Sequence, residues 1–263
     1  MTINHLLHRD AGLKNTFYAL RHGQSLANVA KIISSDPSIS TVQHGLSDIG
    51  KEQAKRAGEQ FAIDYYCSDD NASSSGCSWY EGVAIFSSDF TRARETASIF
   101  AQSLTTTTTS SLPSPPSKQI TIPIYNHQVQ LETRLRERYF GILNGGPDTQ
   151  YQKVWSIDCI DPNHHEFDVE SANEVLERTT RLVIELDDML SSTSSFSGSI
   201  HNNKRWKVIL VAHGDVLQIL QTGFLKHEDA SRHRSLVHLE TATIRELTLL
   251  SNKEIEREEE VQE

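Results

Sequence analysis

Long apolar segments are missing from this sequence of 263 residues, and their absence limits where the protein can work. No run approaches the ~20 apolar residues that a membrane-spanning helix needs. The first residues also lack the order of a signal peptide, in which a charged segment precedes an apolar one. We therefore expect a cytoplasmic protein without a membrane partner.

Cysteine and positive charge are scarce as well. Cys67, Cys77 and Cys159 form an odd, scattered set. A disulfide between the first two is conceivable, but free thiols in a reducing compartment are the better interpretation. Lys and Arg number 25 against 35 Asp and Glu, so the formal net charge is −10 at pH 7. This charge opposes binding to nucleic acid, and an anionic substrate would need a local basic pocket.

Apolar residues are also rare in three low-complexity tracts, residues 67–78, 105–117 and 191–203, which are rich in Ser, Thr and Asn. Such segments bury too little apolar surface to order themselves, so we expect surface loops or disordered insertions. Without them, the chain has the length of one domain. The sequence thus predicts a single domain over residues 1–263 that carries three insertions.

What the sequence does contain is a chemically unusual strand end. Arg21-His22-Gly23 directly follows the apolar run Thr16–Leu20, which predicts a short strand. Open α/β sheets bind their ligands at the carboxyl ends of such strands. Gly23 has no Cβ, so the backbone there can turn sharply and approach an anion. Taken alone, the three residues would indicate only a hydrogen-bonded loop histidine.

The same arrangement recurs along the chain. Three more apolar runs predict strands, and each precedes a residue suited to chemistry: Gly82–Phe86 precedes Arg92, Leu131–Leu135 precedes Glu137, and Lys207–Ala212 precedes His213. Ser88 or Asp89 can cap a helix that carries Arg92 in its first turn. We expect these side chains to gather with His22 at one sheet edge, a coincidence that packing alone does not explain.

Helical patterns separate the predicted strands. Ser47 can cap a helix that runs to about Tyr65, and Ala172–Leu190 has a core-facing aliphatic stripe. A short apolar helix over Val216–Leu225 and a last strand over Thr243–Leu250 complete the pattern. Alternating strands and helices predict an α/β fold, a three-layer sandwich whose mostly parallel sheet carries helices on both faces.

Five motifs resemble the histidine phosphatase superfamily, in the branch that holds the cofactor-dependent phosphoglycerate mutases and fructose-2,6-bisphosphatase. They are Leu20-Arg-His-Gly-Gln-Ser-Leu-Ala-Asn28, Gly45-Leu-Ser-Asp-Ile-Gly-Lys-Glu-Gln-Ala54, Ser88-Asp-Phe-Thr-Arg-Ala-Arg-Glu-Thr-Ala97, Leu135-Arg-Glu-Arg-Tyr-Phe-Gly141 and Val211-Ala-His-Gly214. They occur in the family's order and are spread over most of the chain. The resemblance therefore implies a phosphoglycerate mutase-like fold.

The resemblance also implies roles for the gathered residues. His22 would attack phosphorus and form a phosphohistidine. Arg21 and Arg92 would keep His22 unprotonated and would bind the phosphate oxygens with fork-shaped guanidinium groups. Arg94 lies two residues from Arg92, but only Arg92 has the family's position. His213 would be a further donor to the transferring phosphoryl group.

Glu137 and Asn28 match the family's general acid and phosphate-contacting Asn. Glu137 would protonate the leaving oxygen and later take a proton from water. Without the resemblance, a carboxylate between Arg136 and Arg138 would be interpreted as a surface ion pair, and Asn28 as a turn or cap residue. The implied reaction needs no metal and no cofactor. His164-His165-Glu166 lacks the spacing of a metal site, and His238 lies in a polar stretch that we expect to be solvated.

The charge of one segment favours hydrolysis over mutase chemistry. A mutase must hold its dephosphorylated product in a second anion site, whereas Gly145–Asp168 has Lys153 as its only Lys or Arg among five acidic residues. We therefore expect a phosphatase that acts on phosphate monoesters of small metabolites. The alternatives are a cofactor-dependent mutase and a non-catalytic binding protein with the same fold. Specificity would depend on the loops Val29–Gln43 and Tyr139–Asp168.

Overall fold

The computed structural model describes residues 3–9, 11–70, 80–106, 121–193 and 205–250, and its centre is one β-sheet. Within these residues the sheet has the strand order β3-β2-β4-β1-β5. The strands are β1 (Thr16–Arg21), β2 (Tyr80–Ser87), β3 (Gln130–Leu131), β4 (Arg205–Ala212) and β5 (Ile244–Leu247). The pairs β1–β4, β2–β4 and β2–β3 are parallel, and β5 pairs antiparallel with β1.

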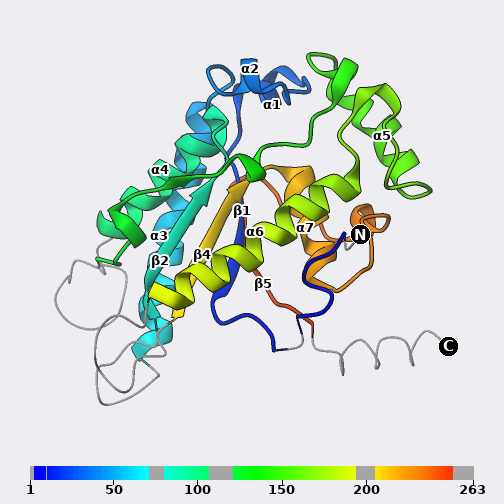
Figure 1. Ribbon diagram of the computed structural model, residues 1–263. Coiled ribbons are helices and arrows are strands. Elements are labelled where there is room, and N and C mark those ends of the chain that lie inside the picture. The colour runs from blue at the N-terminus through cyan, green and yellow to red at the C-terminus, as the bar shows by residue number, and fades with distance from the viewer. Residues whose placement is uncertain (1–2, 10, 71–79, 107–120, 194–204, 251–263) are drawn as a thin grey trace.

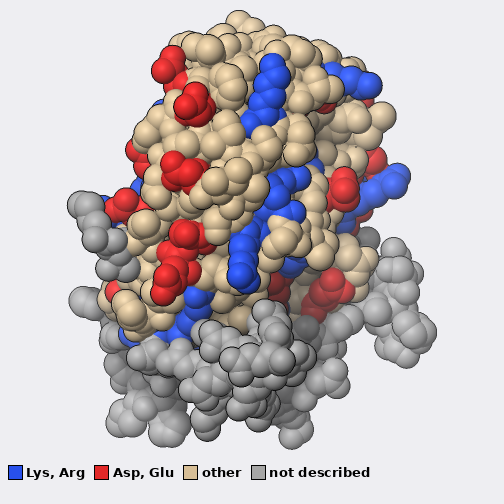
Figure 2. Space-filling model, turned by 90° about the vertical axis from the view of Figure 1, so that its right-hand side faces the viewer, with Lys and Arg blue, Asp and Glu red and all other residues tan. Residues whose placement is uncertain are grey.

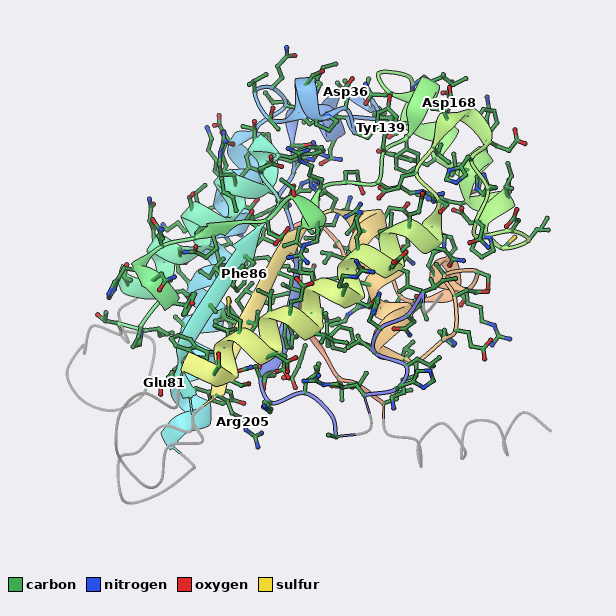
Figure 3. The ribbon with its side chains drawn as sticks, in the orientation of Figure 1. Asp36, Glu81, Phe86, Tyr139, Asp168 and Arg205 are labelled. Carbon is green, nitrogen blue, oxygen red and sulfur yellow. The ribbon has the colours of Figure 1, made fainter. Side chains whose placement is uncertain are left out.

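The register of the three central strands brings their carboxyl ends to one edge. Arg21 of β1 lies beside Ala212 of β4, and Ser87 of β2 lies beside Val211. The residues that follow the strands, His22, Ser88 and His213, therefore emerge together. Figure 3 shows the opposite ends of β2 and β4, at Glu81 and Arg205, far from this edge.

Helices cover both faces of the sheet, as Figure 1 shows. On one face, α3 (Asp48–Asp70) and α4 (Thr91–Thr106) pack Phe61 and Phe100 against Ile85 and Ile209. On the other, α6 (Ala172–Thr193) and α7 (Gly214–Phe224) bury their apolar residues against Val208 and its neighbours in the strands. Because alternate strand residues point to opposite faces, each face has its own core. The predicted three-layer α/β fold is confirmed.

Short elements cluster beyond the carboxyl edge of the sheet. They are the helices α1 (Leu26–Ala30), α2 (Pro37–Ser40) and α5 (Tyr151–Asp158), with 3₁₀ turns at Gly141–Leu143, Asp148–Gln150 and Glu166–Asp168. A small third core under these elements contains Ile33, Phe140 and Val154. Further 3₁₀ turns lie at Tyr125–His127, Thr133–Leu135 and His233–Ser235. The carboxyl edge of the sheet thus faces this layer of short elements (Figure 1).

The predicted strand over Leu131–Leu135 is wrong in most of its length. Only Gln130 and Leu131 pair with β2, and Thr133–Leu135 form a 3₁₀ turn. Glu132 ends the pairing because its carboxylate accepts a hydrogen bond from the backbone N–H of Arg134 at 2.9 Å. This local bond offers the backbone a turn in place of the sheet ladder. Glu137 therefore reaches the edge on a turn rather than directly from a strand.

The other predictions differ from the structure mainly at their boundaries. The helix predicted to end near Tyr65 continues to Asp70, and the predicted aliphatic stripe of α6 is buried as expected. Helices α1, α2 and α5 were not predicted. The first residues of each low-complexity tract extend helices α3, α4 and α6, whereas residues 71–78, 107–117 and 194–203 lie outside the described residues. None of the described helices is long and apolar enough to cross a membrane.

Candidate active site

His22 follows β1 directly, and its hydrogen bonds define which ring nitrogen is free to react. The ring is 3 % exposed. Nδ1 lies 2.7 Å from the carbonyl oxygen of Gly23, which can only accept, so Nδ1 carries the proton. Nε2 accepts a hydrogen bond of 3.2 Å from Nε of Arg92, which can only donate. The lone pair of Nε2 is therefore exposed to the arginine-rich side of the site.

The electrostatic surroundings keep this imidazole neutral. Burial lowers the pKa of His22 well below its ordinary value, and the charges of Arg92 and Arg21 lower it further. Gly23 lets the backbone turn here, but it approaches protein rather than an open anion site. A Cβ at Gly23 would lie 2.4 Å from the carbonyl oxygen of Gly50, and the Gly23 N–H donates to Oγ1 of Thr96 at 3.0 Å.

Arg92 lies in the first turn of α4, where Ser88 accepts a hydrogen bond from the N–H of Phe90 and shapes the start of the helix. Its guanidinium is buried and donates to the carbonyl oxygen of Ser34 at 2.8 Å. It also lies over the ring of Phe90, 5.3 Å from the centroid. Arg94 is exposed, so the structure brings Arg92 rather than Arg94 to the site.

Arg21 is held by residues far away in the sequence. Its Nη1 donates to the carbonyl oxygen of Leu239 at 2.8 Å and to Nε2 of His238 at 2.7 Å. Nδ1 of His238 then donates to Oε1 of Gln218 at 3.1 Å, so the ring is neutral. Burial and the charges of Arg21 and Arg234 lower the pKa of His238. The prediction that His238 is merely solvated is wrong, because this ring lines the pocket and anchors Arg21.

Glu137 lines the same pocket, and neither neighbouring arginine pairs with its carboxylate. Arg136 binds Asp89 at 2.6 Å, whereas Arg138 binds Asp158 at 2.7 Å. Burial and the charge of Asp215 raise the pKa of Glu137 to about 7, against the opposing charges of Arg92 and Arg21. A carboxyl group with this pKa can both donate and accept a proton near neutral pH. The surface ion pair, the other interpretation of Glu137, is therefore absent.

His213 lies beneath the pocket rather than in its wall. The side chain is fully buried, Nε2 lies 3.0 Å from Oγ of Ser88, and the ring centroid is 5.1 Å from that of His22. Burial and the charge of Arg92 hold the pKa of His213 well below its ordinary value. Its Nδ1 has no hydrogen-bond partner among the described residues. The His213 ring thus packs against the His22 ring outside the pocket, whereas the next residue, Gly214, lines the pocket wall.

Asn28 caps a helix and also lines the pocket. Its Oδ1 accepts hydrogen bonds from the backbone N–H and the hydroxyl of Ser25, at 3.0 and 2.9 Å, and so completes the capping box of α1. The residue also lines the pocket and is exposed. The cap does not use the amide nitrogen, which is left as a donor.

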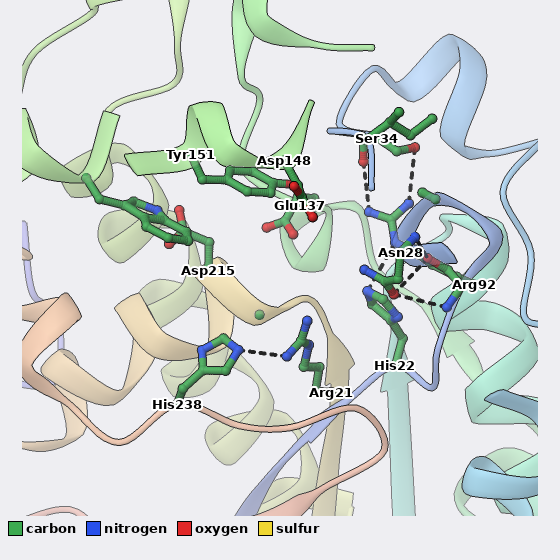
Figure 4. A pocket seen from close by; sticks show the side chains of 15 residues that line it. Arg21, His22, Asn28, Ser34, Arg92, Glu137, Asp148, Tyr151, Asp215 and His238 are labelled. Carbon is green, nitrogen blue, oxygen red and sulfur yellow. Dashed lines mark hydrogen bonds between the residues drawn. The ribbon is translucent and has the colours of Figure 1, made fainter. Parts of the chain in front are cut away.

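The pocket is a cavity of about 300 Å³, and the sequence predicted no individual residue of its remaining wall, although most of that wall lies in the two loops expected to determine specificity. Its wall also contains Ser34, Asp148, Tyr151, Trp155 and Asp215. The rings of Tyr151 and Trp155 stack 5.3 Å apart at an angle of 8°. Figure 4 shows Asp148, Tyr151 and Glu137 together on one side of the pocket, with Ser34, Arg92, Asn28 and His22 on another. The pocket therefore has a basic side and an acidic, aromatic side.

A buried ionic network supports the acidic side from behind. Asp215 lies 3.5 Å from Arg138 and 3.6 Å from His233, and interactions with both outweigh its burial and lower its pKa to about 2. Its charge therefore persists and acts on Glu137. His164, from the His164-His165-Glu166 segment that lacks the spacing of a metal site, lies 2.9 Å from Asp158 in this network. On the molecular surface, by contrast, charges are mixed. Figure 2, which faces the right-hand side of Figure 1, shows acidic and basic side chains interspersed, without a large patch of one sign.

A protein-family model matches part of this chain. The model of the histidine phosphatase superfamily (branch 1) matches residues 119–258, just over half of the chain. This range contains Glu137 and His213, whereas His22 and Arg92 precede it. No curated protein matches the chain significantly.

Solved structures resemble most of the chain. A structure described as mycobacterial hydrolase 1 is 23 % identical, with a TM-score of 0.60 and 88 % of each chain covered. A mycobacterial glucosyl-3-phosphoglycerate phosphatase is 23 % identical, with a TM-score of 0.58 over 88 % of this chain and 89 % of the other. A phosphoserine phosphatase variant from Entamoeba histolytica in complex with phosphoserine is 17 % identical, with a TM-score of 0.57 over 88 % and 89 %. At these identities, the likeness shows a common fold.

Proposed function

The chain belongs to the histidine phosphatase superfamily (branch 1), and we propose that it is a phosphatase that hydrolyses phosphate monoesters of small metabolites through His22. One observation carries this proposal. His22 is a neutral, buried imidazole whose Nε2 lone pair accepts a hydrogen bond from Arg92, beside Glu137 with a pKa of about 7. These are a nucleophile, a phosphate-binding cation and a proton donor in one pocket. The phosphatase names of two structural neighbours agree with this activity.

In the first half of the reaction, the ester phosphate replaces His22 Nε2 as the acceptor for Arg92. Nε2 attacks phosphorus, and the bond from phosphorus to the alcohol oxygen breaks. Protonated Glu137 gives its proton to the leaving oxygen, so a neutral alcohol departs. Arg21 and Arg92 compensate the charge on the other phosphate oxygens. The proton on Nδ1 remains hydrogen-bonded to Gly23 and holds the ring in place.

In the second half, water resolves the phosphohistidine. The Glu137 carboxylate takes one proton from water while the water oxygen attacks phosphorus, and the bond from phosphorus to Nε2 breaks. Inorganic phosphate leaves, and both His22 and Glu137 regain their starting protonation states. The pKa of Glu137 near 7 suits both steps, because neither form is costly at neutral pH.

The pocket wall supports hydrolysis over mutase activity. Among the described residues, Arg21 and Arg92 are the only Lys or Arg side chains that line it, and we assign both to the phosphate side. A mutase intermediate would need a second cationic site to retain the dephosphorylated alcohol. The wall offers Asp148 and Asp215 there instead.

The test is phosphate release from a panel of monoesters by the purified protein and by His22→Ala. We expect the wild-type protein to release phosphate, orthovanadate to inhibit it as a five-coordinate analogue, and the variant to be inactive. In parallel, interconversion of 2- and 3-phosphoglycerate should be negligible with or without 2,3-bisphosphoglycerate. Fast interconversion that depends on the bisphosphate, with little phosphate release, would identify a mutase and overturn the proposal.

A further inference from the structure

One segment forms the side of the pocket where the leaving alcohol must lie. Because Glu137 protonates the leaving oxygen in the proposed reaction, the alcohol portion of the substrate is adjacent to Glu137. Tyr151 feels the charge of Glu137, and Asp148 lines the same pocket, on the side where Figure 4 draws all three. Asp148 begins a 3₁₀ turn that leads directly into α5, which contributes Tyr151 and Trp155. The alcohol thus faces a carboxylate and two stacked aromatic rings.

Both arginines of the pocket donate their hydrogen bonds to residues other than Asp148. Arg92 donates to Ser34 and His22, and Arg21 donates to His238 and Leu239. None of these partners is Asp148. Arg234 lies against the aromatic wall, with its guanidinium 3.7 Å from the centroid of the Trp155 ring. It also donates to Gln218, and it does not line the pocket.

Asp148 differs from Asp215 because no described cation pairs with its carboxylate. Asp215 faces Arg138 and His233 at 3.5 and 3.6 Å. The Asp148 carboxylate, by contrast, has no hydrogen bond or ion pair with any described residue, although its backbone N–H is bound to the carbonyl oxygen of Lys31. A ligand group that donates hydrogen bonds or carries positive charge would supply the missing partner. A second anion would instead meet uncompensated repulsion.

We propose that Asp148 is a specificity-determining residue that selects monoesters of uncharged polyols and amino alcohols against monoesters that carry a second anion beside the phosphate. This inference rests on the proposed function of the same pocket. Hydroxyl and ammonium groups donate to the carboxylate, whereas a substrate carboxylate or second phosphate is repelled by it. The stacked rings of Tyr151 and Trp155 provide an apolar surface for the carbon chain of the alcohol.

Two pairs of substrates isolate the effect of charge on the same short carbon skeleton. Glycerol 3-phosphate and 3-phosphoglycerate differ by a hydroxymethyl group against a carboxylate, and phosphoethanolamine and phosphoglycolate differ by an ammonium against a carboxylate. We expect kcat/KM of the wild-type protein to favour the first member of each pair about tenfold, as a charge pair in a half-buried pocket would.

The substitution Asp148→Asn removes the charge while retaining the shape of the side chain. We expect it to reduce both preferences about fivefold, mainly by raising kcat/KM for the two carboxylate substrates. Asp161→Asn is the matched control, because Asp161 is an exposed acid on the same segment that does not line the pocket. The two substrate preferences of the Asp161→Asn variant should equal those of the wild-type protein. Hydrolysis of p-nitrophenyl phosphate and the melting temperature verify that each variant is folded and active.

The outcomes separate this inference from the proposed function. If Asp148→Asn hydrolyses p-nitrophenyl phosphate normally but keeps the wild-type preferences, Asp148 does not determine specificity. If the wild-type protein prefers the carboxylate substrates, the inference is equally wrong, although the phosphatase stands. If the wild-type protein releases phosphate from no monoester, including p-nitrophenyl phosphate, the proposed function fails and the inference fails with it.

Discussion

The two sides of the pocket differ in how the chain builds them. The phosphate side, with Arg21, His22 and Arg92, emerges from the carboxyl ends of buried parallel strands and the first turn of α4. The alcohol side, with Asp148 and Tyr151, comes from a short turn and a short helix in the irregular layer above the sheet. One side is cationic, with His22 and Arg92 buried, and the other is acidic, aromatic and half-exposed.

This difference indicates which residues of the site can be substituted without loss of catalysis. Moving Arg92 would disturb α4 and its contact with Ser34, whereas α5 is held outside the sheet, by the small core around Val154 and by the buried pair of Asp158 with Arg138. Catalytic groups need positions fixed to a fraction of an ångström, which a sheet edge provides. Groups that select the alcohol need only complement it. We therefore expect changes on the phosphate side to affect every substrate alike, and changes on the alcohol side to affect substrates differently.

The largest effect should come from the phosphate side, at Arg92. We expect Arg92→Ala to lower kcat/KM for all monoesters about a thousandfold, since it removes charge-assisted hydrogen bonds that strengthen in the transition state. Arg94→Ala, a matched change of an exposed arginine two residues away, should remain within about twofold of wild type by the same reasoning. Arg92→Lys keeps the charge in case the alanine variant does not fold. Comparable losses at Arg92 and Arg94 would show that the wrong arginine has been assigned.

Glu137 lies between the two sides, so the size of its effect should depend on the leaving group. Glu137→Gln should slow alkyl esters by about a hundredfold or more, because their alkoxides need a proton to depart. Nitrophenyl esters should slow much less while dephosphorylation of the enzyme is not rate-limiting. In the wild-type protein, kcat/KM for alkyl esters should fall as the pH rises through about 7, where Glu137 loses its proton. An unchanged falling limb in the variant would assign that ionisation to another group.

His238 supports the phosphate side indirectly, and its effect should be smaller. His238→Ala removes the acceptor that holds Arg21 at 2.7 Å. We expect KM to rise and orthovanadate inhibition to weaken about tenfold, with a smaller change in kcat, because a charge-assisted hydrogen bond contributes about 1.5–3 kcal/mol. His238→Gln, which offers an amide oxygen, should recover part of the loss. His8→Ala, at an exposed histidine, is the control. A purely structural role would lower kcat and stability without weakening vanadate binding.

The smallest and most selective effect should come from the alcohol side. Trp155→Ala removes one of the two stacked rings but no group that touches the phosphate. We expect KM to change about three- to tenfold by amounts that differ between alcohols, as the loss of apolar contact area predicts. Inhibition by inorganic phosphate should stay within about twofold of wild type. Weakened phosphate inhibition would show that the two sides are coupled rather than separate.

The sequence allowed the phosphate side to be predicted because strand ends carry their chemistry next to a strong local signal. The runs before His22 and His213 are apolar and β-prone, and Ser88, one of the two predicted caps, lies just before the helix that carries Arg92. Glu137 was identified by its motif, although the strand predicted before it is only two residues long. The roles given to these residues remain predictions that the geometry supports.

The sequence predicted that the loop Tyr139–Asp168 would affect specificity, but it could not identify the residues of the alcohol side, for a physical reason. Asp148, Tyr151 and Trp155 lie on a turn and on a helix of eight residues, too short for a hydrophobic period to identify. His238 approaches Arg21 across 217 positions of sequence, and only the folded chain brings the two together. A polar stretch with several histidines is typical of a solvated loop, so no local pattern pointed to this contact.

Trapping the phosphorylated enzyme tests the central claim most directly. The wild-type protein is mixed with a ³²P-labelled monoester, quenched in alkali within milliseconds, and digested to locate the label. We expect a label that is stable in alkali, labile in acid and confined to the peptide with His22, and no label in His22→Ala despite a wild-type circular dichroism spectrum. Rapid phosphate release without any labelled protein, or a label on another residue, would contradict the account.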